Sequence, residues 1–188
     1  SPHTEVVMIL RKYGLDPDKD VTFLQIGGSS SRYAALESNS IQAAMLVPPF
    51  NKIGRKRRGF NELVAINDVV KIPFGGLAVH LDKIWEKSQE IVKIIGATLK
   101  SINFIRERKN EILTFMDKSW GIKDPEIREE IYRDIVILYN PTGIASDATM
   151  KNVIQMVQES RKTAANVPLS NIVDWGFAQK ANDELKKR

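Results

Sequence analysis

The feature that most constrains the fold is a change of pattern near residue 75 of this 188-residue chain. Before it, short apolar runs alternate with helix-like stretches: VTFLQI (21–26), IQAAMLV (41–47), ELVAIND (62–68) and FGGLAVH (74–80). After it, apolar residues such as Ile84, Ile91 and Ile95 recur at helical spacing. Alternating strands and helices predict βαβ units with a parallel-rich sheet, so we expect an α/β fold.

Local capping signals predict where the helices begin and end. A small polar residue followed by an early proline or acidic residue is typical of a start, and glycine or asparagine of an end. The expected starts are Ser1, Ser29, Asp124 and Ser146, and the expected ends are Gly14, Asn39, Gly59, Gly121 and Asn140. From Asp82 onward we expect a mostly helical chain, with a loop and final helix over 169–185.

A glycine-serine turn (residues 27–31) lies between the first predicted strand and the helix after it. The first N–H groups of a helix lack intrahelical partners, so such a turn at the edge of a sheet can receive an anion. The residues SPHT at the start of the chain offer a second helix end, where His3 either donates to a ligand or lies on the surface. The simpler interpretation of both is a capped turn with nothing bound.

Composition excludes several classes of site. The chain has no cysteine, so it forms no disulfide and no thiolate metal site. His3 and His80 are the only histidines, too few for a multi-histidine zinc centre. No Ser-His-Asp arrangement is supported by local motifs, and Gly75 and Gly76 lack the Lys-Ser/Thr pair of a phosphate loop. We therefore predict no catalytic residue, no metal and no cofactor.

Three stretches carry a resemblance to a known family. They are LRKYGLDPDKDVTFLQIGGSSSRYAALESNSIQAAMLVPP (10–49), GFNELVAIND (59–68) and VDWGFAQKANDEL (173–185). In order and spacing they resemble substrate-binding proteins of ABC importers, in the branch that handles nitrate, sulfonates, taurine and thiamine-pyrimidine precursors. Asn39 and Gln42 stand where the family's motif has glycine and aspartate. Asn39 suits the left-handed conformation that glycine would adopt there.

The resemblance implies a periplasmic-binding-protein fold of type II. Residues 1–74 would form an incomplete lobe two, and residues 75–188 the crossover strand and C-terminal helices of lobe one. Family members are longer, so we expect a fragment whose sheet has exposed edges. We then expect either a homodimer that completes the sheet by exchange or a missing companion segment.

The resemblance also implies passive capture of a small polar or anionic organic molecule in a cleft between lobes, with no enzymatic activity. The partner would be a membrane permease, and the location periplasmic or extracellular, with a lipid anchor as one option. The positions that would bind the ligand are Ser1, His3, Thr4, Gly28, Ser29, Ser30, Pro48 and Pro49. The alternative role for the two prolines is to terminate a strand.

Two other functions stay open at this point. One is the effector-binding domain of a transcription regulator, and the other is an enzyme of pyrimidine synthesis with the same fold. Sequence upstream would separate them through an export signal, a DNA-binding domain or catalytic residues.

A cluster of cations in KIGRKRRG (52–59) suggests contact with phosphate, an anionic lipid headgroup or an acidic permease surface. The simpler interpretation is a solvated helix face. No aromatic residue is interleaved with these charges, which argues against single-stranded nucleic acid, and we expect no nucleic-acid partner.

Overall fold

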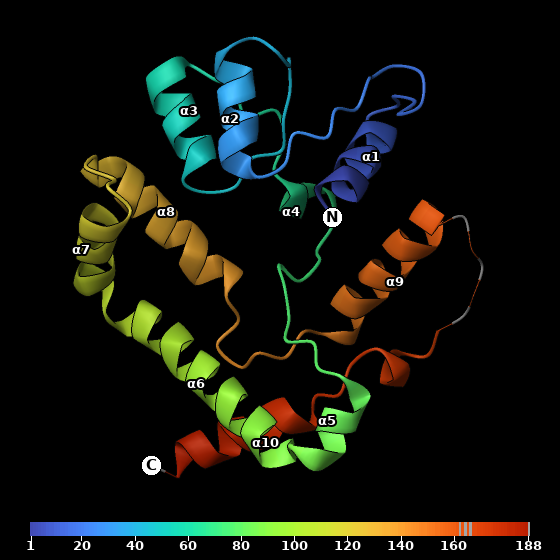
Figure 1. Cartoon of the computed structure of the whole chain (residues 1–188), viewed down its shortest axis with the longest axis vertical. Coiled ribbons are helices and arrows are strands. Elements are labelled where there is room, and N and C mark those ends of the chain that lie inside the picture. The colour runs from blue at the N-terminus through green and yellow to red at the C-terminus, as the bar shows by residue number, and fades with distance from the viewer. Residues whose placement is uncertain (162, 164, 166, 188) are drawn as a thin grey trace. The chain divides into compact units, whose positions relative to one another are not determined.

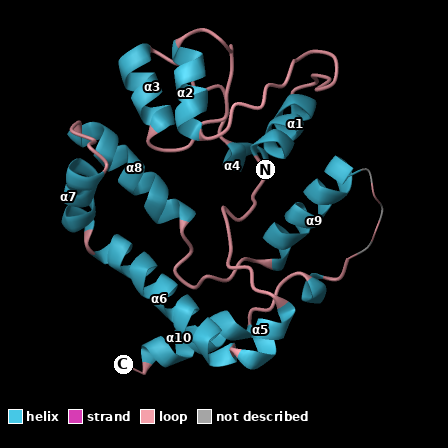
Figure 2. Cartoon of the chain, in the orientation of Figure 1, coloured by secondary structure: helices cyan, strands magenta, loops and turns pink. Residues whose placement is uncertain are grey.

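The computed structural model describes residues 1–161, 163, 165 and 167–187, and the chain divides into two compact units. Unit 1 comprises Ser1–Lys71 and Glu159–Lys162, and unit 2 comprises Ile72–Gln158 and Thr163–Arg188. Helices joined by loops form each unit (Figures 1 and 2).

Unit 1 is held by two helix pairs. Its helices are α1 (Pro2–Lys12), α2 (Ser29–Glu37), α3 (Phe50–Arg58) and α4 (Ile66–Val69). Helix α1 packs on α4, and α2 packs on α3. The ring of Tyr33 in α2 lies 5.8 Å from that of Phe50 and 5.9 Å from that of Phe60, so three aromatic rings fill the α2–α3 contact. This aromatic cluster holds α2 against α3.

Unit 2 has the larger apolar core. Its elements are α5 (Leu81–Glu86), α6 (Ser88–Glu107), α7 (Lys109–Ser119), α8 (Pro125–Leu138), most of α9 (Asp147–Arg161), a 3₁₀ turn (Leu169–Asn171) and α10 (Gly176–Lys186). Helix α6 packs on α10 around Val92, Leu99 and Ala181, and α7 packs on α8. The side-chain hydroxyl of Tyr132 donates to the carbonyl of Ile105 at 3.0 Å, which ties α8 to α6. The largest fully buried side chains that the structure describes all lie in this unit.

The predicted helix boundaries are confirmed where the capping residue lies within one helical turn of the groups that it caps. Asp124 accepts hydrogen bonds from the backbone N–H groups of Glu126 and Ile127, and Pro125 opens α8. Gly59 ends α3 with φ at +68°. Asn39 has φ at +56°, so the left-handed conformation expected for it is also confirmed.

The predicted sheet is wrong, because no β-strand forms among the described residues (Figure 2). The periplasmic-binding-protein fold that the resemblance implies is therefore not supported. The 21–26 run is non-helical, as a strand would be, but Phe23 and Leu24 remain 41% and 62% exposed. A strand needs a second backbone to pair with, and an apolar sequence alone does not supply one.

The end of the third run folds differently again, since Ile66–Val69 forms the single turn α4. The FGGLAVH run (74–80) has no regular secondary structure, and Leu77 in it is 57% exposed. Without a sheet, the homodimer expected to complete it loses its structural basis.

One ion-pair cluster in unit 2 leads to a pH prediction. Asp117 in α7 accepts a hydrogen bond from Nζ of Lys123 at 2.8 Å and lies 3.4 Å from Nη1 of Arg128 in α8. The hydrogen bond from Lys123 is the main cause that lowers the pKa of Asp117 below its ordinary 3.8. Because the folded pKa lies below the unfolded one, the pair stabilises the fold above pH 3.8, and this stability is lost as the pH falls through the folded pKa.

We expect Asp117→Asn to lower the midpoint of thermal unfolding at neutral pH and to weaken its dependence on acid below about pH 4. Differential scanning calorimetry from neutral to acid pH measures both effects. Asp183→Asn is the control, since exposed Asp183 accepts its hydrogen bond from the neutral Gln179. If the midpoint of thermal unfolding fell with acid in the same way for both variants, the stabilising role of the Asp117–Lys123 pair would be contradicted.

Candidate functional site

The glycine-serine turn leads into α2 in unit 1. Gly27 has φ at +92°, which turns the chain, and Gly28 is the extended N-cap residue before Ser29. No side chain among the described residues caps the first turn of α2. A Cβ built on Gly27 or Gly28 would meet no described atom within 4 Å, so the backbone here is open to approach. An open first turn with uncapped N–H groups is able to donate to an anion.

Arg32 adds positive charge to the same turn. Its Nη2 donates to Oγ of Ser29 at 3.1 Å, and its buried Nε has no hydrogen-bond partner among the described residues. The first turn of α2 contains no acidic residue. A cation near a helix N-terminus opposes the helix dipole, whereas an anion there is favourable by about 0.3–1 kcal/mol. The charges at this turn therefore favour a negatively charged ligand group.

Sequence reasoning missed Arg32. The signal was available, because Arg32 follows Ser29 by three positions and two residues three apart share one face of a helix. The predicted residues Gly28, Ser29 and Ser30 do lie together at this turn, as their sequence order requires.

The start of α1 is closed by its own side chains. Oγ of Ser1 accepts from the backbone N–H of Thr4 at 3.4 Å and lies 3.0 Å from Oγ1 of Thr4. The ring of His3 meets the ring of Phe23 edge-on at 4.5 Å between centroids, which places His3 against the segment that precedes the glycine-serine turn. Ser1 and Thr4 act as a helix cap here, and a ligand role for them stays a prediction.

Pro48 and Pro49 lie directly before α3. Pro49 is the N-cap residue of α3, and the N–H of Phe50 donates to the carbonyl of Val47 at 3.0 Å. Both prolines are half-buried. They begin the helix that packs on α2, and their place on a ligand-cleft wall stays a prediction.

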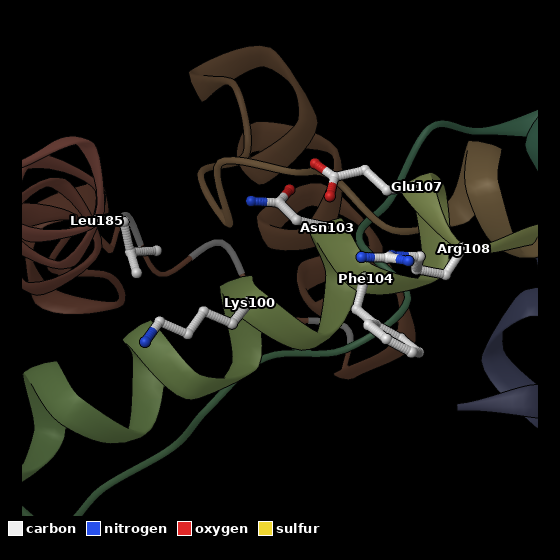
Figure 3. Close-up of a pocket in the computed structure, with 6 residues that line it drawn as sticks. All are labelled: Lys100, Asn103, Phe104, Glu107, Arg108 and Leu185. Carbon is white, nitrogen blue, oxygen red and sulfur yellow. The ribbon is translucent and has the colours of Figure 1, made fainter. Parts of the chain in front are cut away.

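An open hollow lies on unit 2, away from these residues in sequence. It is lined by Lys100, Asn103, Phe104, Glu107 and Arg108 around the end of α6, and by Leu185 of α10. Lys100, Asn103, Phe104 and Glu107 follow one another at helical spacing, so they share the face of α6 that lines the hollow (Figure 3). The hollow is open and is lined by charges of both signs, so it favours no one class of ligand, and α2 remains the better candidate.

Two absences concern the described residues only. No cluster of three or more histidine, aspartate or glutamate side chains there is arranged to hold a metal ion. No helix in the described part of the chain has the length and apolar character needed to cross a bilayer.

Comparison with known proteins adds no relative. No family model, no curated protein and no solved structure matches this chain. The resemblance to substrate-binding proteins therefore rests on the three sequence stretches alone.

Proposed function

We propose that this chain is the solute-binding component of an ABC importer and captures a small organic anion at the start of α2. The observation that carries the proposal is the open, uncapped first turn of α2 with Arg32 beside it. The three motif stretches support the class of protein. The turn itself requires no sheet, because it is formed by Gly27, Gly28 and the start of α2 within unit 1.

Each residue at the turn has a distinct role in this proposal. The backbone N–H groups at the start of α2 donate to a carboxylate or sulfonate, and Gly28 leaves room for its approach. The hydroxyls of Ser29 and Ser30 add neutral donors, and Arg32 supplies the opposite charge. No covalent bond forms or breaks. The ligand is passed to a permease outside the cytoplasm.

Substitution of Gly28 tests the proposal without depending on loss of folding. The backbone of Gly28, with φ −73° and ψ 172°, accepts any L-residue, and its missing side chain faces open space. We expect Gly28→Asp to cap α2 and stabilise it, because aspartate is a preferred N-cap residue. Its carboxylate also occupies the place of the ligand anion. Charge-assisted hydrogen bonds contribute about 1.5–3 kcal/mol, so anion affinity should fall by about tenfold or more.

Isothermal titration calorimetry of the chain measures this loss, with ethanesulfonate and acetate as anions, taurine as a zwitterion that carries a sulfonate, and dimethyl sulfone and acetamide as neutral counterparts. Gly28→Asn is the matched control, since it offers the same cap without the charge. We expect it to keep more anion affinity than Gly28→Asp. Binding of the neutral compounds alone, or equal anion affinity in wild type and Gly28→Asp, would overturn the proposal.

A further inference from the structure

The cation at the start of α2 has no counter-charge among the residues that the structure describes. Arg32 follows a first turn that contains no acidic residue. Its side chain makes one hydrogen bond, from Nη2 to Oγ of Ser29, and no ion pair within the described part of the chain. Because a cation at this end of a helix opposes the helix dipole, the helix alone does not explain the position of Arg32.

The guanidinium of Arg32 has a defined orientation. Its Nε is fully buried and has no partner among the described residues, and its Nη2 is held by Ser29 at 3.1 Å. Its Nη1 also lacks a partner there but, unlike Nε, is not buried. The Nε side of the group is therefore covered by the protein, and the end that carries Nη1 reaches the surface of unit 1.

The hydroxyl of Ser29 is available to fix this orientation. Gly28 is the N-cap residue of α2, and no side chain in the described part of the chain caps this helix, so Ser29 has no capping role. A serine hydroxyl has one hydrogen to donate and two lone pairs that accept. Ser29 can therefore accept from Nη2 of Arg32 and still donate its own hydrogen to a ligand.

A guanidinium recognises the shape of an anion as well as its charge. Two parallel N–H groups match two oxygens that are bonded to one atom, as in a carboxylate or a sulfonate. A single-atom anion such as bromide cannot accept both bonds in this geometry. The ammonium group of lysine carries the same charge but lacks the fixed fork.

We propose that Ser29 is a positioning residue, which holds Arg32 so that its Nη1–Nη2 edge receives two oxygens of one carboxylate or sulfonate group. This inference deepens the proposed function and rests on it, because the same turn of α2 is the binding site. Arg32 then selects two-oxygen anions over single-atom anions, and Ser29 sets that selectivity through Arg32.

The positioning role is tested first in the ligand-free chain. Nuclear magnetic resonance measures how fast the proton on Nε of Arg32 exchanges with water, and exchange in the wild type should be slow because Nε is covered. Ser29→Ala should speed this exchange by about tenfold or more, since a hydrogen bond to a charged group is lost. Ser29→Thr keeps the hydroxyl and should restore the slow rate.

Ser31→Ala is the matched control. Ser31 lies in the same turn, is exposed, and has a hydroxyl without a partner among the described residues. The same deletion of a hydroxyl there should leave the exchange rate of Arg32 within about twofold of the wild type. Circular dichroism confirms that each variant is folded.

Isothermal titration calorimetry with acetate, ethanesulfonate and bromide then tests the selectivity. The quantity compared is the ratio of the affinity for acetate or ethanesulfonate to the affinity for bromide. Ser29→Ala should lower this ratio by about tenfold, and Arg32→Lys by at least as much, because each removes the oriented fork. Ser29→Thr and Ser31→Ala should keep the ratio within about twofold of the wild type.

The outcomes separate this inference from the proposed function. Exchange of the Arg32 proton that Ser29→Ala leaves unchanged would overturn the positioning role, and an unchanged ratio in Arg32→Lys would overturn the selectivity. Both results leave solute capture standing if the wild-type chain binds acetate and Gly28→Asp does not. A wild-type chain that binds none of the three anions would overturn solute capture and the assigned ligand group together.

Discussion

Replacement of Ile131 with alanine is expected to lower the free energy of unfolding of unit 2 by about 2–5 kcal/mol. Ile131 in α8 is fully buried, as is Met116 in α7, the helix on which α8 packs. The loss combines the transfer free energy of the deleted carbons with the cost of the cavity that they leave. Urea denaturation followed by tryptophan fluorescence measures it, because all three tryptophans lie in unit 2.

Ile137→Ala on the same helix is the control. Ile137 is 80% exposed, so the same deletion removes little buried surface there and should change the free energy of unfolding by less than about 0.5 kcal/mol. The two variants differ only in the face of α8 that they alter. Equal losses in both would show that the buried face of α8 is assigned incorrectly.

The helix ends of this chain could be predicted from sequence because their determinants are local. The cap at Asp124 involves N–H groups two and three residues away. At the end of α2, the N–H of Ser40 donates to the carbonyl of Ala35 at 2.9 Å, and that of Asn39 donates to Leu36 at 3.1 Å. This pair of bonds is a Schellman motif, and it needs one residue that tolerates positive φ. All the residues that form such a motif lie within six consecutive positions, so the sequence alone shows them together.

Whether a sheet forms could not be predicted from local residues in the same way. The run VTFLQI does lie outside any helix, which agrees with its β-branched and aromatic composition. Whether such a run becomes a strand depends on a second backbone alongside, and that partner is distant in sequence. The end of ELVAIND shows the competition, since Ile66–Val69 forms a helical turn that packs on α1. The side-chain ammonium of Lys12 in α1 donates through Nζ to the carbonyl of Asp68 at 3.2 Å.

The candidate site likewise has features that depend on neighbouring residues and features that depend on residues distant in sequence. The glycine-serine turn was predicted from its residues, because glycine and serine between an apolar run and a helix have few other uses. The contact of His3 with Phe23 joins residues twenty positions apart, and no local pattern predicts it. Arg32 lies between these cases, since its position on α2 was readable but its hydrogen bond to Ser29 depends on a side-chain rotamer.

Replacement of Gly54 with alanine is expected to destabilise unit 1. Gly54 is buried in α3, and a Cβ there would lie 2.5 Å from Cδ2 of Phe60. The ring of Phe60 cannot move away freely, because it packs against Tyr33. Overpacking of this kind costs about 1–3 kcal/mol, which exceeds the gain of up to about 1 kcal/mol in helix propensity. Hydrogen exchange with mass spectrometry should show faster exchange in peptides that cover α2 and α3.

Gly96→Ala makes the same substitution where space is available. Gly96 lies inside α6, and a Cβ there would meet no described atom within 4 Å. Only the gain in helix propensity remains, so α6 should be stabilised by about 0.5–1 kcal/mol and exchange more slowly. One chemical change then has opposite signs in two helices, and the sign depends on the neighbouring ring. If Gly54→Ala also slowed exchange, Phe60 would not be packed on α3, and the aromatic cluster that positions α2 and its open turn would have to be abandoned.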